Sequence, residues 1–188
     1  MIMKQLNKVI IMVSHGMPPS DYPPRDKVEF FRLMSRFHND SNTDFKSSDY
    51  ERYVYLEKDM RDWPRNRKND PFSIASQLVA KNLSQKADCP VICAFNEFAS
   101  PSIEDAFERA IQMNPDEIMV ITPMMIRGGS HSDKDIPQAI VEARKKYPHI
   151  KLSYIWPFAE EDIAEFLFHR IEVSERNKSN AANPLVNH

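Results

Sequence analysis

The sequence predicts an α/β domain with a mainly parallel sheet of four strands and a largely helical insertion after the first strand. The first observation behind this prediction is an alternation of short apolar runs with stretches of helical periodicity. This alternation is typical of β-α-β units joined by right-handed crossovers. The second observation is a break in the alternation at residues 18–70, where prolines, aromatic residues and charges accumulate. We interpret this stretch as an insertion, and a lid, an interface and plain covering structure are all open as its role.

Strands are expected at four apolar runs, namely 8–13, 90–95, 117–122 and 150–156. The first three runs are almost continuously apolar, as strands buried on both faces of a sheet should be. In the fourth run apolar and polar residues alternate, and this pattern is typical of a strand with one exposed face. We therefore expect the fourth strand to lie at an edge of the sheet.

Helical patterns separate and follow these strands, at 26–38, 71–84, 101–113, 132–147 and 159–173. Ser132 is the expected N-cap of the fourth helix, because a serine side chain can accept a bond from a free N–H group of the first turn. The last helix has an apolar stripe that we expect to face the interior. Its members are Ile163, Phe166, Leu167 and Ile171.

The length of 188 residues suits a single domain, which we place at residues 1–176. The tail at 177–188 is polar, has little to bury and is expected to be disordered. With 41% hydrophobic and 28% charged residues and a net charge of -2, the chain has no general basic surface for nucleic acid. No apolar run approaches the roughly 20 residues of a membrane helix, and the N-terminus lacks the long apolar region of a signal peptide. We expect a cytoplasmic protein with neither nucleic acid nor membrane as a partner.

The two cysteines, Cys89 and Cys93, are spaced C-x-x-x-C, unlike the C-x-x-C of zinc and redox motifs. Positions four apart along a strand are too distant for a disulfide bond. We interpret both cysteines as small apolar residues in a reducing cytoplasm.

All three glycines of the chain fall in two short segments that also contain a histidine, SHG at 14–16 and GGSH at 128–131. Glycine lets a backbone turn sharply or admit a ligand closely. His15, Glu97 and His131 each follow a different predicted strand. Because ligands of open parallel sheets bind outside the carboxyl ends of the strands, we expect these three side chains to converge there.

Two imidazoles and a carboxylate form a ligand set suited to iron, cobalt, nickel or zinc. The same groups can also move protons near neutral pH. Capping or packing is the alternative for each histidine taken alone. Ordinary surroundings at a helix end, in a turn, within a helix and in the tail account for the other four histidines, His38, His149, His169 and His188.

Several nucleotide and hydrolase motifs are missing from the sequence. Neither G-x-x-x-x-G-K, G-x-G-x-x-G nor G-x-S-x-G occurs. The SHG segment is similar to the Arg-His-Gly start of phosphohistidine phosphatases, but Ser14 stands where the phosphate-holding arginine would be. A phosphatase is therefore disfavoured.

Four segments resemble the sirohydrochlorin chelatases, the CbiX-like branch of the class II chelatases. The most specific is ITPMMIRGGSHSDKDIP at 121–137, which is similar to the family pattern of strand, Pro, Gly-containing turn, His and Asp-Ile-Pro. The others are VIIMVSHG at 9–16, CAFNEFASPSIEDAF at 93–107 and WPFAEEDIAEFLFHRI at 156–171. The resemblance covers residues 8–16 and about 90–173, and it leaves out the insertion.

The resemblance implies a chelatase-like three-layer α/β/α sandwich. It implies that His15 and His131 bind an incoming divalent metal, and that Glu97 helps as a carboxylate by holding the metal or taking a proton. The implied reaction is ATP-independent insertion of Co²⁺ or Fe²⁺ into sirohydrochlorin or a related tetrapyrrole, for cobalamin or siroheme biosynthesis. The metal, with Ni²⁺ also open, is then a substrate, and no organic cofactor is expected. Short members of the family pair as homodimers, so a homodimer is expected here.

The chemistry of the ligand set suits metal transfer. Neutral imidazoles hold a cation softly enough to pass it on, whereas a closed site with four protein ligands would retain it. Because the ligands must be deprotonated, activity should fall in mild acid.

Four residues near His131 are candidates for contacts with the tetrapyrrole. Arg127 and Lys134 could meet its carboxylates, with solvated surface charges as the alternative. Met124 and Met125 could lie against the macrocycle, because methionine adapts to flat apolar surfaces. Ordinary core packing is the alternative for both methionines.

Two other classes of function stay open at this point. One is a noncatalytic protein that binds metal or tetrapyrrole on a chelatase fold. The other is a chelatase fold that serves only as an interaction module.

Overall fold

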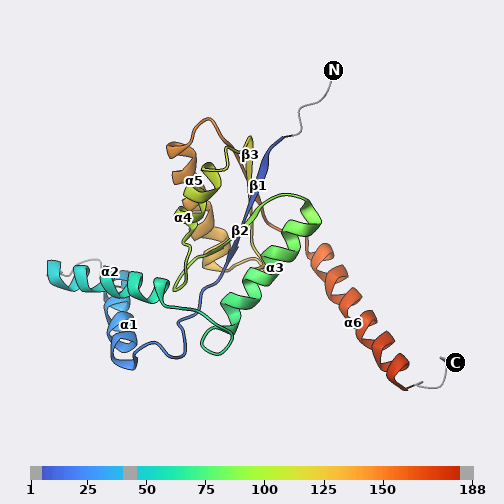
Figure 1. The fold of residues 1–188 in the computed structure, drawn as a ribbon, viewed down its shortest axis with the longest axis horizontal. Coiled ribbons are helices and arrows are strands. Elements are labelled where there is room, and N and C mark those ends of the chain that lie inside the picture. The colour runs from blue at the N-terminus through green and yellow to red at the C-terminus, as the bar shows by residue number, and fades with distance from the viewer. Residues whose placement is uncertain (1–5, 40–45, 183–188) are drawn as a thin grey trace.

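The computed structural model describes residues 6–39 and 46–182 (Figure 1). Within these ranges the chain alternates strands and helices, and all strand pairs are parallel, which confirms the α/β class. In chain order the elements are β1 (Lys8–Ser14), α1 (Pro24–Asn39), α2 (Ser47–Asp62), α3 (Pro71–Ala87), β2 (Val91–Phe95), α4 (Ile103–Ile111), β3 (Glu117–Ile121), a π-helical turn η1 (His131–Asp135), α5 (Ile136–Lys146), β4 (Lys151–Ile155) and α6 (Glu160–Ala182).

The strand order in the sheet is β2-β1-β3-β4. The fourth strand lies at an edge, as its alternating pattern predicts. β2 forms the other edge, where Val91, Ile92 and Cys93 are only half-buried, so the prediction of burial on both faces was wrong for this strand. An apolar run shows that a strand is hydrophobic, but it does not show which neighbours the strand will have.

Helices cover both faces of the sheet, which gives the three layers of an α/β/α sandwich (Figure 1). On one face α4 and α5 pack against alternate residues of the central strands, such as Ile11 and Val120, which are fully buried. Each such side chain contributes about 1.5–3 kcal/mol relative to an exposed one. On the other face α3 lies over β1 and β2, where Met12 is also buried.

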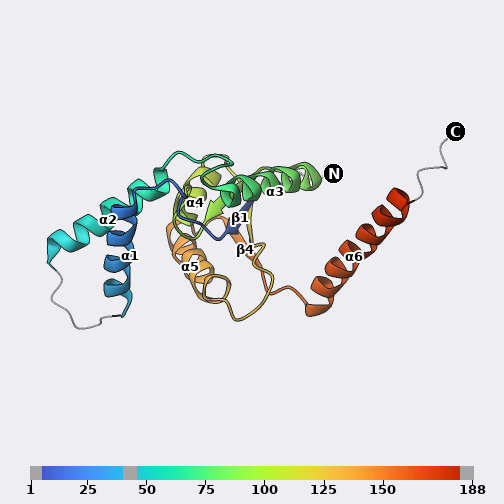
Figure 2. The same cartoon turned by 90° about the horizontal axis from the view of Figure 1, so that it is seen from below.

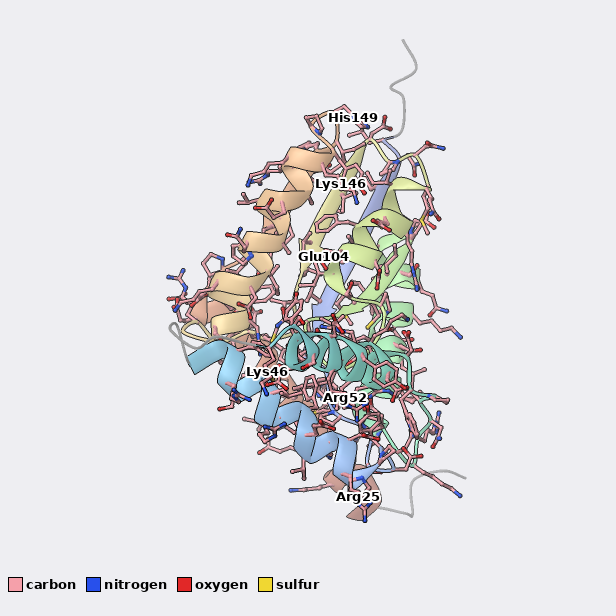
Figure 3. The ribbon with its side chains drawn as sticks, turned by 90° about the vertical axis from the view of Figure 1, so that its left-hand side faces the viewer. Arg25, Lys46, Arg52, Glu104, Lys146 and His149 are labelled. Atoms are coloured by element: carbon pink, nitrogen blue, oxygen red, sulfur yellow. The ribbon has the colours of Figure 1, made fainter. Side chains whose placement is uncertain are left out.

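The insertion is a helical hairpin with its own small core. α1 and α2 bury Phe30, Leu33, Leu56 and Met60 between them, together with Tyr22 from the preceding loop. Arg52 lies between the two helices (Figure 3) and donates to the carboxylates of two α1 residues, Asp26 at 2.6 Å and Glu29 at 2.9 Å. The hairpin lies beyond the carboxyl ends of the strands (Figures 1 and 3).

α6 differs from its prediction. It extends away from the sheet (Figure 2), and Phe166, Leu167 and Ile171 are about half-exposed, so the inward orientation predicted for its apolar stripe was wrong. Amphipathic spacing indicates that a helix has a face to cover, but it does not specify the covering surface. The helix also runs past residue 176 to Ala182, while residues 183–188 of the predicted disordered tail lie outside the described residues.

The prediction of Ser132 as an N-cap was also wrong. The helical turn begins one residue earlier, at His131, so Ser132 lies inside η1 and is buried. Its hydroxyl donates to the carbonyl oxygen of Gly129 at 3.3 Å. The residue preceding the turn is Ser130, whose side chain makes no capping hydrogen bond.

In the part of the chain that the structure describes, no helix combines the length and the apolar character that a membrane crossing requires.

Candidate metal centre

Three side chains that are far apart in the sequence meet at the carboxyl edge of the sheet. His15 directly follows β1, Glu97 follows β2, and His131 opens η1 in the segment after β3. Each offers one ligand atom, and these atoms all lie within 4.8 Å of one another. The predicted convergence of the three residues is therefore confirmed, while their roles remain predictions.

One carboxylate oxygen lies between the two imidazoles. Oε1 of Glu97 is 2.9 Å from Nδ1 of His15 and 3.5 Å from Nε2 of His131. The two rings are nearly perpendicular, with their centroids 4.4 Å apart. When Nδ1 of His15 carries a proton, it donates to Glu97, so a cation bound by the same two atoms would replace that proton.

The centre is open to solvent. The side chains of His15, Glu97 and His131 are 45%, 29% and 20% exposed. A cation can therefore reach the ligand atoms, and a further molecule can approach from the same direction. Structural metal sites are usually closed by four protein ligands, whereas sites that exchange or transform a ligand keep a position free.

Asp135 and Asn96 join this centre, although neither was singled out from the sequence. Oδ2 of Asp135 lies 2.6 Å from Nδ1 of His131. An N–H at Nδ1 that donates to this carboxylate leaves the lone pair of Nε2 facing Glu97, which is the orientation that a metal ligand needs. The side-chain amide nitrogen of Asn96 lies 2.6 Å from the same Nδ1 and donates to Oδ2 of Asp135 at 3.2 Å. The spacing of four between His131 and Asp135 in a helical segment was the available signal.

Glycine at position 16 is required by a close approach of two backbones. The amide of Asn96 donates to the carbonyl oxygen of Ser14 at 2.9 Å, which joins the ends of β1 and β2. A Cβ atom at Gly16 would lie 1.5 Å from the carbonyl oxygen of Glu97. The loop of His15 and the loop of Glu97 are thus in direct contact, and a larger residue would force them apart.

Gly128 has a different role. Its φ angle is +93°, a conformation that side-chain-bearing residues rarely adopt, and no atom would contact an added Cβ within 4 Å. Its amide donates to the carboxylate of Asp133 at 2.8 Å, which closes the turn before η1. Glycine is therefore required at position 128 by the backbone conformation of the turn and not by a lack of space for a side chain.

An apolar cavity of about 330 Å³ adjoins His15 between the sheet and α3. Met124 lines it together with Phe72 and Val79. The buried hydroxyl of Ser14 also lines it and has no hydrogen-bond partner among the described residues. Met124 packs against the main core as well, so the structure is compatible with both interpretations of this residue.

The other candidate substrate residues lie in the same segment as His131. Met125 is half-buried, and Lys134 is exposed. The Arg127 side chain is 58% exposed, and its Nε lies 3.9 Å from the carboxylate of Glu160. Contact with a substrate remains a prediction for all three.

Comparison with known proteins places these features in context. The family model described as CbiX matches residues 66–174, which is more than half of the chain. The chain is 32% identical to the sirohydrochlorin ferrochelatase of Priestia megaterium over 109 residues, covering 55% of this chain and 40% of that protein. It is 33% identical to the sirohydrochlorin cobaltochelatase of the same organism over 84 residues, covering 44% of this chain and 27% of that protein. The chain thus spans less than half the length of these curated relatives.

Among solved structures, the sirohydrochlorin chelatase SirB from Bacillus subtilis subspecies spizizenii, in complex with cobalt, aligns with 89% of this chain and 50% of its own. The sequence identity is 17% and the TM-score is 0.44.

Proposed function

Because this chain belongs to the CbiX family, we propose that it inserts a divalent metal, Co²⁺ or Fe²⁺, into sirohydrochlorin or a related tetrapyrrole without ATP. The reaction would serve cobalamin or siroheme biosynthesis. The observation that carries the proposal is the open cluster of two imidazoles and one carboxylate, with ligand atoms within 4.8 Å of one another. The metal is a substrate in this reaction, with Ni²⁺ as a further candidate, and no organic cofactor is expected.

Each residue of the cluster has a task in this proposal. His15 and His131 hold the incoming cation through neutral ring nitrogens, and the contact with Asp135 keeps Nε2 of His131 available. Insertion of the metal releases two pyrrole N–H protons. The Glu97 carboxylate, which lies between the two rings, is the group best placed to accept one of them. Because the cluster is open, the cation can pass to the macrocycle once its water is displaced.

The surroundings of the cluster suit a flat, carboxylate-bearing substrate. Met124 and the apolar cavity beside His15 offer a surface for part of the ring, and Met125 extends it. Arg127 and Lys134 are exposed cations on the segment of His131, available to the peripheral carboxylates.

A test of the activity combines the purified protein, sirohydrochlorin and Co²⁺ and follows the change in absorption. We expect His15→Ala and His131→Ala each to lower the rate by at least about 100-fold, because each removes a metal ligand. His149→Ala, outside the centre, is the matched control and should keep the parent rate. If both ligand variants retain the parent rate, the assignment is wrong.

The alternative functions are separated by binding measurements. Titration calorimetry that detects Co²⁺ or tetrapyrrole binding without turnover would favour a noncatalytic binding protein. No heat from either ligand would favour an interaction module.

We further propose that the chain forms a homodimer in which α6 packs on a second copy. The sheet face opposite α4 and α5 is poorly covered at β3 and β4, where Ile121 is half-buried and Ile155 is 42% exposed. The apolar stripe of α6 has the complementary character. The start of the connection to α6 is anchored, because Trp156 donates to Asp133 at 2.9 Å and stacks on Tyr154.

Light scattering on the eluting protein tests the dimer. We expect Leu167→Glu to convert a dimer into a monomer and Glu165→Arg, on the opposite side of α6, to leave it intact. To test the packing of α6 on a second copy, two differently tagged chains without native cysteines carry Ile155→Cys and Phe166→Cys respectively. A bismaleimide crosslink that joins the two differently tagged chains supports this packing. The proposed dimer is overturned if the parent protein is a monomer and a crosslink forms only within a single chain that carries both cysteine substitutions.

A cytoplasmic location is part of the same proposal. The two cysteines are free thiols, which suits a reducing compartment.

A further inference from the structure

The loop that carries Glu97 is bonded to two arginines of the insertion. Arg61, near the end of α2, donates to the carbonyl oxygens of Asn96 at 3.2 Å and Ala99 at 3.0 Å. Its guanidinium is also paired with Glu57 at 3.2 Å, and its side chain is only 17% exposed. Arg61 therefore bonds the loop on both sides of Glu97.

Arg65 is bonded still more completely. Its side chain is 9% exposed, and each of the five N–H groups of its guanidinium has an acceptor. The acceptors are the carbonyl oxygens of Met17 at 2.7 Å, Met60 at 2.6 Å, Trp63 at 3.2 Å and Phe98, and the buried carboxylate of Asp70. Met17 lies two residues after His15, and Phe98 follows Glu97, so a single guanidinium bonds both loops of the metal centre.

The loop needs such support because part of it is strained. Phe98 has a φ angle of +57°, which is unfavourable for a bulky residue and persists only where the surroundings enforce it. Its ring packs against Phe30 and Phe31 of α1, with centroids 6.0 Å and 5.7 Å away. The insertion thus holds this residue from both ends, by its side chain and by its carbonyl oxygen.

We propose that Arg61 and Arg65 are positioning residues, through which the insertion holds the Glu97 carboxylate in place against the loop of His15. In this proposal the insertion shapes the metal centre by holding the loop that carries Glu97. This inference rests on the proposed metal centre, but its first test does not need the metal.

Amide hydrogen exchange of the metal-free full-length protein is the first test. We expect Arg61→Met and Arg65→Lys to speed exchange in residues 96–99 by at least about tenfold, because local opening becomes easier. Lysine at 65 has three donors in place of five and cannot span both loops. Arg52→Met is the matched control, since Arg52 is also on α2 and ion-paired, but its two carboxylate partners are on α1. It should leave exchange in residues 96–99 at the parent rate.

Co²⁺ titration is the second test. We expect Arg61→Met to weaken Co²⁺ binding about tenfold and to change the visible bands of the bound ion, because the carboxylate is displaced. The KM for Co²⁺ should rise while the KM for the tetrapyrrole stays the same. Arg61→Lys, which keeps a donor, should restore part of the affinity.

The outcomes separate the two proposals. A parent protein that binds no Co²⁺ contradicts the proposed function, while the exchange data still decide the positioning role. Unchanged exchange in residues 96–99 of a folded Arg61→Met protein overturns the positioning role, as does an equal effect of Arg52→Met. If Arg65→Lys does not fold, the Arg61→Met variant alone decides whether the positioning role holds.

Discussion

The two histidines of the candidate metal centre stand in very different surroundings. The side of His15, residues 14–17 and 96–99, is a braced side, where two backbones touch at Gly16 and two arginines bond the loops. The segment that leads to His131, residues 126–130, is an open side, although the His131 side chain itself is only 20% exposed and is in contact with Asp135. There Ile126 is 71% exposed and Gly128 has free space around it.

In the proposed function this difference is useful, because the site has to select a cation and then give it up. A rigid pair formed by His15 and Glu97 fixes the distance between two ligand atoms. In the proposed function His131 is the third ligand, and the loop that precedes it has room to shift as the ion moves to another acceptor. The comparison teaches that one half of such a site can fix the distance between two ligand atoms, while the loop of the other half stays exposed to solvent.

The largest effect is expected from Gly16→Ala, which breaks the braced side. The new Cβ would lie 1.5 Å from a backbone oxygen that cannot rotate away, so the loops must separate. We expect about 3 kcal/mol of lost stability, at the upper end of the cost of overpacking. Thermal unfolding and Co²⁺ titration measure it. Gly129→Ala is the control, because its Cβ would make an ordinary contact at 3.4 Å with the Ser132 hydroxyl. Equal behaviour of the two variants would contradict the comparison.

The next effect is expected from Asp135→Ala, which loosens the His131 ring next to the open side. Loss of the contact between Asp135 and Nδ1 removes one restraint on the ring orientation and leaves Asn96 as the other. We expect Co²⁺ affinity to fall about tenfold, with the fold retained. Titration calorimetry measures the affinity, and Glu142→Ala on the exposed surface of α5 serves as the control. An unchanged affinity would mean that the carboxylate does not orient the ring.

A smaller effect is expected from Gly128→Ala. The positive φ angle is costly for alanine, but nothing blocks its methyl group, so about 1 kcal/mol of stability should be lost. Denaturant unfolding gives the value. A loss as large as that of Gly16→Ala would show that the open side is as constrained as the braced one.

The smallest perturbation is thiol labelling, which sharpens the comparison without altering the fold. Burial raises the pKa of the Cys93 thiol to about 12, and burial also raises the pKa of Cys89. Because the thiolate is the reactive form, iodoacetamide at pH 8 should label Cys89 first, and labelling of Cys93 should rise about tenfold per pH unit up to its pKa. Mass spectrometry follows both sites. In Gly16→Ala the Cys93 rate should increase, since β2 leads into the braced side, and an unchanged rate would place the disturbance elsewhere.

The sequence was informative wherever a local pattern determines the outcome. The alternation of runs predicts the strands and the helices around them, because burial on a sheet or a helix face follows a fixed period. Likewise, the convergence of His15, Glu97 and His131 follows from parallel strands whose carboxyl ends share one edge.

What the sequence did not show depends on contacts between distant segments. The position of β2 at an edge, the exposure of α6 and the bonds from Arg65 to Met17 and Phe98 all join parts of the chain with no shared local pattern. Ser132 was misassigned because the helical turn starts one residue earlier, at His131, and local sequence fixes helix ends poorly.

The order of the strands has a consequence for when the proposed metal site can form during synthesis. His15 and Glu97 are 82 positions apart, and His131 emerges from the ribosome later still. No short stretch of nascent polypeptide can therefore present the complete cluster, since its three residues meet only after β1, β2 and β3 have paired. We therefore expect added Co²⁺ to stabilise the completed fold only and to raise the melting temperature of the intact protein.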